Sequence, residues 1–134
     1  MSFKKYVNNL ILKQASKLNY RVSSNAPGTF KDLYNSTSLV IWDGASDNSW
    51  FQDASVNYAF RALHDTLHLK TMIGFTPKEE IELGRVQANQ YTGLMADLVY
   101  SQVAGQAEYY LNNGIFVPNE VEFTSNQLNL GATV

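Results

Sequence analysis

The chain has two histidines, His64 and His68, and they stand four residues apart with Asp65 between them. On an α-helix, residues i and i+4 lie almost above one another, and residue i+1 falls on the flank of the same face. Two imidazoles and a carboxylate can therefore converge on one point, as in helical metal sites of the His-x-x-x-His kind. A fourth ligand has to come from another segment.

Glu80 is the candidate for that fourth ligand. Gly74 suits the left-handed C-cap of one helix, and residues 76–79 (Thr-Pro-Lys-Glu) predict the capped start of the next. Glu80 then lies on the first turn after a tight reversal, and an antiparallel helix pair would bring it back toward His68. Two imidazoles and two carboxylates suit zinc, iron or manganese, and geometry rather than affinity decides among these metals.

The spacing of these four residues resembles a known motif. His64-Asp65-x-x-His68, eleven further residues and Glu80 match the HDxxH-x11-E zinc motif of the Coq4 family, helical proteins of ubiquinone biosynthesis; the match spans 17 of 134 residues. The resemblance implies that these four residues hold zinc and that the protein acts on a small ring-bearing or prenylated ligand. The run 58–65 also looks like small phage-encoded proteins with a Phe-Arg-Ala-x-His-Asp type of motif.

Three further polar residues could support the metal ligands. Arg61 lies one helical turn before His64, where it could pair with Glu80 or with an anionic ligand, although a surface salt bridge is an equal alternative. Asn57 lies a further turn back on the same face, and Gln87 lies two turns past Glu80. Either amide could orient a ligand or a bound water.

Alternatives to a metal site remain open. Without metal, His64 and His68 could hydrogen-bond the carboxylates of Asp65 and Glu80 in a polar network between two helices. A metalloprotease of the HExxH kind is disfavoured, because Asp65 is one carbon shorter than the glutamate base and would reach a bound water poorly. The additional histidines of HD phosphohydrolases are absent from the chain.

Three functions follow from these alternatives. The first is a metal-dependent enzyme, in which an open coordination position polarises a ligand oxygen or activates water. The second is a non-catalytic protein, such as a phage-encoded accessory or host-interaction protein, in which the cluster joins two helices. The third is a helical interaction module without metal.

Composition narrows the class of protein. With 134 residues and 45% hydrophobic residues, the chain is expected to fold as one domain, and a formal charge of −2 gives no footprint for nucleic acid. Cysteine is absent, which excludes disulfides and thiolate metal sites. No run approaches the roughly 18 apolar residues of a membrane-spanning helix. We therefore expect a soluble cytoplasmic protein, located in the host cytoplasm if the gene is a phage gene.

The hydrophobic pattern predicts a mainly α fold, a single-domain helical bundle over residues 1–134 with a central antiparallel helix pair. Gly84 lies in a stripe of residues along one face of the predicted helix that follows residue 77, and this stripe predicts that the motif helix packs closely against that face. The expected helices cover residues 2–19, a short segment near 30–34, 53–72 with a cap from residue 48, 49 or 53, and 77–112 with a break near 89–93. The expected non-helical segments are turns at 21–28 and 43–48, an isolated buried extended segment at 38–42, an extended tail at 115–123 and a flexible end at about 125–134.

Overall fold

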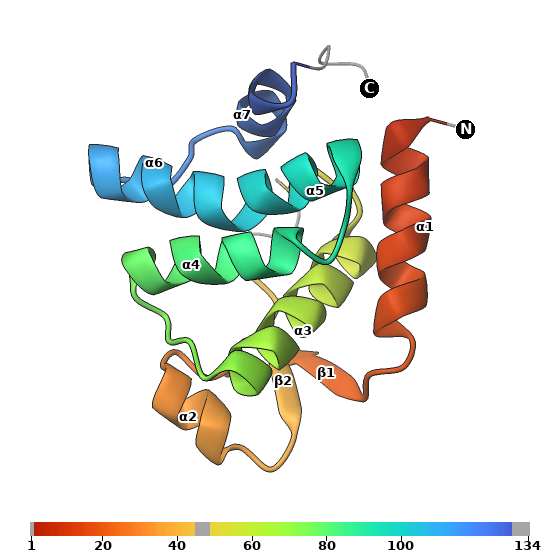
Figure 1. Ribbon diagram of the computed structural model, residues 1–134. Coiled ribbons are helices and arrows are strands. Elements are labelled where there is room, and N and C mark those ends of the chain that lie inside the picture. The colour runs from red at the N-terminus through yellow and green to blue at the C-terminus, as the bar shows by residue number, and fades with distance from the viewer. Residues whose placement is uncertain (1, 45–48, 130–134) are drawn as a thin grey trace. The chain divides into compact units, whose positions relative to one another are not determined.

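A computed structural model describes residues 2–44 and 49–129 of the chain. These residues are mainly helical, with a small two-stranded sheet, and this confirms the predicted fold class. The elements are α1 (Phe3–Ala15), β1 (Tyr20–Ser23), α2 (Phe30–Asn35), β2 (Leu39–Trp42), α3 (Ala54–Thr71), α4 (Pro77–Ala88), α5 (Gly93–Tyr100), the π-helix η1 (Ser101–Gly105), α6 (Gln106–Asn113) and α7 (Glu120–Gln127). Figure 1 labels the α-helices and the two strands.

The chain divides into two compact units, Met1–Met72 and Ile73–Val134. The first unit contains α1 to α3 with both strands, and the second contains α4 to α7. Each unit is helical by itself. The single domain and the antiparallel pairing of the motif helix with the next helix stay predictions.

In the first unit, α1 packs against α3 through a stripe spaced by four residues, Val7, Ile11 and Ala15. Such spacing places apolar side chains on one helical face. The helix begins after Ser2, whose side chain accepts a hydrogen bond from the backbone N–H of Lys5. It ends at Ala15, four residues before the predicted end at residue 19, because the chain turns there and enters a strand.

The two strands pair in parallel, with Arg21 opposite Val40. The predictions of a turn at 21–28 and of an unpaired segment at 38–42 are therefore wrong in part. The apolar run of β2 was visible in the sequence, but its partner β1 has two exposed residues among its four and lacks that signal. Parallel strands need a long connection, and α2 lies in this one.

The motif helix α3 agrees closely with the predicted range of 53–72. Asp53 caps it, since its side chain accepts hydrogen bonds from the N–H groups of Ser55 and Val56. The helix ends at Met72, which adopts the left-handed conformation at φ 61°, so the predicted cap at Gly74 is wrong. Gly74 instead faces a carboxylate, because a Cβ added there would lie 2.8 Å from the Glu79 oxygens.

In the second unit, the predicted span of 77–112 is broken at the expected place, after Ala88. The capping box of α4 at Thr76 and Glu79 is confirmed. Gly84 allows close approach of η1, since an added Cβ would lie 2.7 Å from the Cβ of Ala104. Gly84 therefore has a close neighbour in its own unit, and the packing of the motif helix against the rest of the stripe stays a prediction.

The predicted extended tail at 115–123 is wrong for residues 120–123, which belong to helix α7 (Glu120–Gln127). Asn119 accepts a hydrogen bond from the N–H of Glu122 and starts α7, whose Phe123 packs edge-on against Tyr109. The prediction of a flexible end fails for residues 125–127, which belong to α7, and residues 130–134 lie outside the described part of the chain. The expected turn at 43–48 lies mostly outside it as well. No helix in the described ranges is both long enough and apolar enough to cross a membrane.

Candidate metal centre

The structure brings together three of the four predicted ligands, all on α3. His64, Asp65 and His68 each offer one ligand atom, and these atoms lie within 4.8 Å of one another. The Nε2 atoms of the two histidines are 3.0 Å apart, and the rings are nearly perpendicular, at 84°. This group could therefore hold a metal ion.

The three candidate ligands differ in burial. His68 is buried, with 1% of its surface exposed, and its ring lies 6.4 Å from that of Phe30 on α2. His64 and Asp65 are half-buried. The arrangement fixes one imidazole firmly and leaves the other two groups accessible for adjustment around an ion.

The separation of the two Nε2 atoms can be compared with that of two imidazole nitrogens bound to one zinc ion. Two imidazoles bound to zinc at about 2.05 Å in a tetrahedral arrangement hold their nitrogens roughly 3.3 Å apart. The observed separation of 3.0 Å differs from this by a few tenths of an ångström. The Asp65 ligand atom lies within 4.8 Å of both imidazole ligand atoms.

The same separation also fits a hydrogen bond without metal. In that case one Nε2 carries a proton and donates it, while the other accepts. The proton and the metal compete for the same lone pairs. The bond between the two histidines is thus the metal-free alternative to coordination.

Glu80, the fourth predicted ligand, lies on the first turn of α4 in the second unit. Its backbone N–H donates to the carbonyl of Thr76, and its Oε1 atom is buried. Its neighbour Glu79 uses both carboxylate oxygens in capping the turn, accepting from Gly74 and Thr76. Glu80 as a ligand stays a prediction.

Arg61 is engaged by β2. Its Nη1 donates to the carbonyl of Trp42 at 2.6 Å, and its guanidinium lies 5.2 Å from the centre of the Trp42 ring. Tyr58, one turn earlier, donates to the carbonyl of Asp43. These bonds tie the motif helix to the strand, a role that spacing along the helix did not reveal. The predicted role of Arg61 beside the metal is not tested by them.

The two predicted supporting amides are both buried. The Nδ2 atom of Asn57 makes no hydrogen bond within the described part of the chain. Gln87 lies on α4 in the second unit. Their roles in orienting a ligand or water stay predictions. Phe30, by contrast, was missed: the short helix at 30–34 was expected, but no local signal shows that its aromatic ring packs on His68.

A second group of titratable side chains lies in the second unit. The hydroxyl of Tyr100 donates to Oε1 of Glu108 at 2.5 Å. This hydrogen bond, together with burial, raises the pKa of Tyr100 above its ordinary value of 10.0, while Arg85 acts in the opposite direction. The group links the helix α5 to α6 across η1.

Comparison with known proteins finds no match to this chain among family models, curated proteins or solved structures. The geometry of the site therefore carries the functional argument.

Proposed function

We propose that the protein binds a divalent transition metal through His64, Asp65 and His68, and that this metal is zinc. The observation that supports the proposal best is the 3.0 Å separation of the two Nε2 atoms, with a carboxylate of the same helix beside them. One buried and one half-buried imidazole form a pair that a metal ion would hold together.

Zinc is favoured by the donor set. Imidazole nitrogen suits zinc, copper, iron and nickel, while sites for manganese are usually richer in oxygen ligands. Zinc is satisfied by four ligands, and three on one helix already supply most of that shell. Iron is the nearest competitor, since two histidines and one carboxylate also form the triad of non-haem iron enzymes.

Glu80 decides what kind of zinc site this is. Structural zinc sites are closed by four protein ligands, whereas catalytic sites keep three protein ligands and an open position. The Coq4-like spacing supports Glu80 as a metal ligand, either bound throughout or displaced when a ligand arrives. A position opened in this way would polarise an oxygen of a small organic or prenylated ligand.

A structural role is the alternative, as in a phage-encoded accessory or host-interaction protein. It is favoured by the burial of His68 against Phe30, which places one ligand in a packed environment. Under this alternative the metal stabilises the fold and reacts with nothing.

Zinc titration against a chromophoric chelator tests the proposal. Wild-type protein prepared without a histidine tag should bind one equivalent. His64→Ala and His68→Ala should abolish the binding, and Asp65→Asn should weaken it by about 10- to 100-fold. Lys70→Ala is the matched control, because Lys70 is exposed on the same helix. Equal affinity in wild type and both histidine variants would contradict the proposal.

Cobalt substitution separates the two kinds of site. In a closed site, Glu80→Gln changes the visible spectrum of bound Co²⁺, and added carboxylate or hydroxamate probes leave the wild-type spectrum unchanged. In an open site, such probes shift the wild-type spectrum by entering the free position. A wild-type spectrum that responds to the probes thus supports the enzyme, and an inert one supports the structural role.

A further inference from the structure

The second unit contains a π turn within a longer helical rod. Helices α5, η1 and α6 follow one another without a break, and Figure 1 shows them as one rod with α4 on one side and α7 on the other. A π turn forms hydrogen bonds between residues i and i+5, so it inserts one residue into an α-helix; such turns are rare and frequently lie at functional sites. Contacts with neighbouring elements therefore decide whether η1 keeps this conformation.

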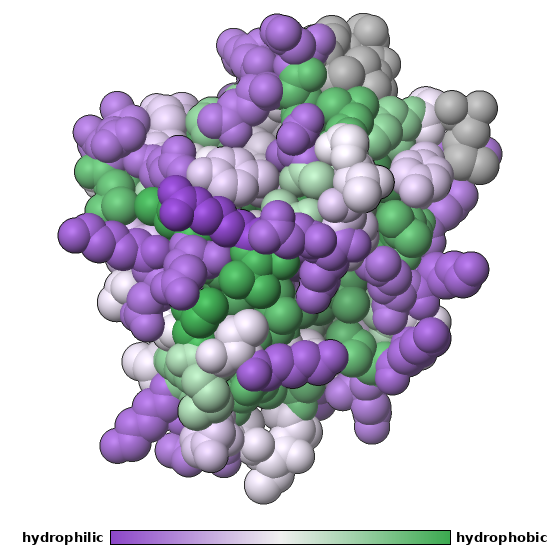
Figure 2. Space-filling view, viewed as in Figure 1, coloured by the Kyte–Doolittle hydropathy of each residue, from purple (hydrophilic) through white to green (hydrophobic). Residues whose placement is uncertain are grey.

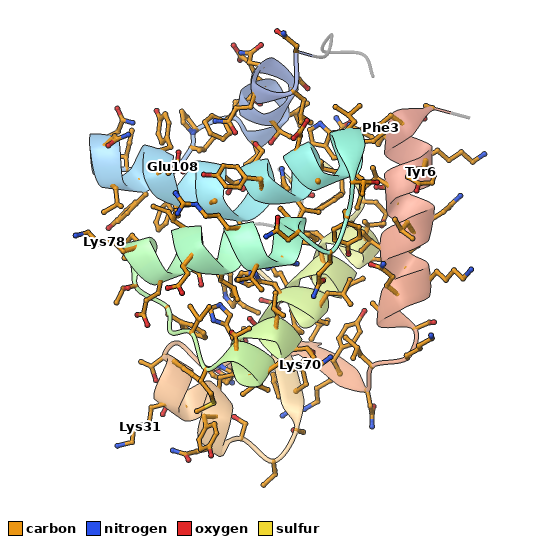
Figure 3. All side chains as sticks on the ribbon, in the orientation of Figure 1. Phe3, Tyr6, Lys31, Lys70, Lys78 and Glu108 are labelled. Atoms are coloured by element: carbon orange, nitrogen blue, oxygen red, sulfur yellow. The ribbon has the colours of Figure 1, made fainter. Side chains whose placement is uncertain are left out.

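A hydrogen bond across η1 depends on the inserted residue. The hydroxyl of Tyr100 donates to Oε1 of Glu108, which is labelled in Figure 3 and lies eight residues further along the rod. In a regular α-helix, residue i+7 lies on the same face as residue i, but residue i+8 is displaced by about 80° around the axis. Because the π turn adds one residue, Glu108 takes the place that residue i+7 would have. Without the π turn, Tyr100 and Glu108 would point apart.

Two charged groups act on the Tyr100 phenol. The hydrogen bond to Glu108 on α6, together with burial, raises the pKa of Tyr100 above the ordinary value of 10.0, and Arg85 on α4 acts in the opposite direction. Loss of the bond to Glu108 would therefore bring this pKa down. The pKa of Tyr100 thus reports whether residues 101–105 hold the π turn.

Helix α7 contacts η1 through side-chain hydrogen bonds. Oγ of Ser101 donates to Oε1 of Gln127 at 2.6 Å, and Nε2 of Gln102 donates to Oγ1 of Thr124 at 2.8 Å. A Cβ added at Gly105 would lie 2.5 Å from the same Oε1 of Gln127. Ser101 and Gly105 stand at the two ends of η1 and both face Gln127, so their fit to α7 changes if the turn returns to the α form.

The rest of α7 is held weakly. Its buried residues, Thr124 and Ser125, are both polar, and the ring of Phe123 packs edge-on against Tyr109. Figure 2 shows mainly hydrophilic surface over this helix. Segments with few buried apolar contacts open at a small fraction of the free energy of global unfolding. Helix α7 can therefore detach while the rest of the second unit stays folded.

Two features allow η1 and α6 to change register. Within α6, all of which the structure describes, no residue is buried, so rotation of this helix removes little apolar burial. Gly84 of α4 presents no side chain to Ala104 of η1, so these two segments can slide past each other. Both features leave the register of the rod to α7 and to the bond between Tyr100 and Glu108.

We propose that α7 and η1 form a conformational switch in the second unit. With α7 docked, residues 101–105 hold the π turn and the bond between Tyr100 and Glu108 is made. When α7 detaches, the segment returns to a regular α-helix, α6 rotates by about 100°, the angle of one residue, and the bond breaks. Docking of α7 and formation of the bond therefore stabilise each other by the same free energy. The switch does not involve the candidate metal ligands on α3.

Hydrogen exchange of the α7 amides, followed by NMR at neutral pH in the full chain, measures how often α7 detaches. Tyr100→Phe removes a bond that α7 does not make, and it should still speed this exchange about two- to fivefold. Thr124→Val and Gln127→Ala remove the acceptors on α7, and together they should speed it at least about tenfold. Asn126→Ser is the matched control, because Asn126 is exposed on the same helix.

The pKa of Tyr100 separates a switch from independent local contacts. In the variant with both α7 changes, the pKa of Tyr100 should fall toward 10.0, because Glu108 has rotated away. The Cζ resonance of Tyr100 follows this titration. Gln127→Ala alone, at an exposed position, should change the exchange and the pKa in the same directions by less, and it is the variant to use if the double variant does not fold.

The proposal is overturned if the α7 amides of Tyr100→Phe exchange at the wild-type rate, since docking and the phenol bond are then independent. It is overturned as well if the α7 amides stay protected as in wild type after both acceptors are removed. A pKa of Tyr100 that stays raised while the α7 amides exchange freely would also contradict it, because the π turn would then persist without α7.

Discussion

The Nε2 atoms of His64 and His68 lie 3.0 Å apart on successive turns of α3. This distance fits either a proton shared between the two nitrogens or two imidazoles bound to one metal ion. Because Asp65 is adjacent on the same helix, the occupant would also meet a carboxylate. A metal ion would bind all three groups at once, whereas a proton would be shared between the two imidazoles.

Metal binding should stabilise the folded protein. At a free zinc concentration about 100 times the dissociation constant, linkage adds roughly 2.7 kcal/mol to the free energy of unfolding. For a chain of this size the expected rise in Tm is about 5–12 °C. Differential scanning calorimetry with and without zinc measures it. His64→Ala should remove the zinc-dependent rise, whereas an equal rise in that variant would place the binding elsewhere.

Replacing Arg61 by alanine should destabilise the first unit. The change removes the hydrogen bond to the Trp42 carbonyl and the contact with the Trp42 ring. A charged hydrogen bond and an exposed cation–π contact together predict a loss of about 1–2 kcal/mol, measured by urea unfolding. Lys70→Ala, on the same helix, serves as the control with little effect. A loss as small as that of the control would show that the contact to β2 does not stabilise the helix.

Gly84→Ala should destabilise the second unit, because the added Cβ would lie 2.7 Å from both the Cβ and the backbone N of Ala104. Overpacking of this kind costs about 1–3 kcal/mol. Gly28→Ala is the matched control, since no atom lies within 4 Å of a Cβ added there. Thermal unfolding of both variants measures the difference. Equal stability of the two would refute the close approach of α4 and η1.

The hydrogen bond from Tyr100 to Glu108 predicts that the stability of the protein depends on pH. The raised pKa of Tyr100 means that the folded state favours the protonated phenol. The stabilisation is therefore fully present below pH 10.0, the ordinary pKa, and is lost as the pH rises through the higher pKa of the folded state. Tyr100→Phe should cost about 0.5–1 kcal/mol at neutral pH, because the group is partly exposed.

Urea unfolding of wild type and Tyr100→Phe between pH 7 and 11 measures that difference. The gap between the two proteins should narrow at the alkaline end, and effects of other titrating groups cancel in the comparison. A gap that is constant across this range would contradict the role of the phenol proton.

The sequence predicted features that depend on local chemistry. The capping box at Thr76 and Glu79 follows from residue types at a fixed spacing, and so does the placement of His64 beside His68. These features depend on residues that are close in sequence, so residue types at a fixed spacing are enough to predict them. The end of α6 at Gly114 belongs to the same class.

Features that depend on tertiary contacts were missed. The pairing of β1 with β2 joins segments about twenty residues apart, and β1 has no apolar pattern of its own. Gly84 was correctly seen as a point of close approach, but its neighbour is Ala104, in the same unit. The end of α3 at Met72 instead of Gly74 also runs against residue preference, since a glycine was available two residues later.

The most direct test of the metal site is elemental analysis of protein purified without a histidine tag and dialysed against trace zinc. Wild type should retain about one equivalent of zinc per chain, as expected for a site with three or four protein ligands, and the double variant His64→Ala and His68→Ala should retain none. Wild-type protein with no transition metal above the level of that double variant would contradict the proposal.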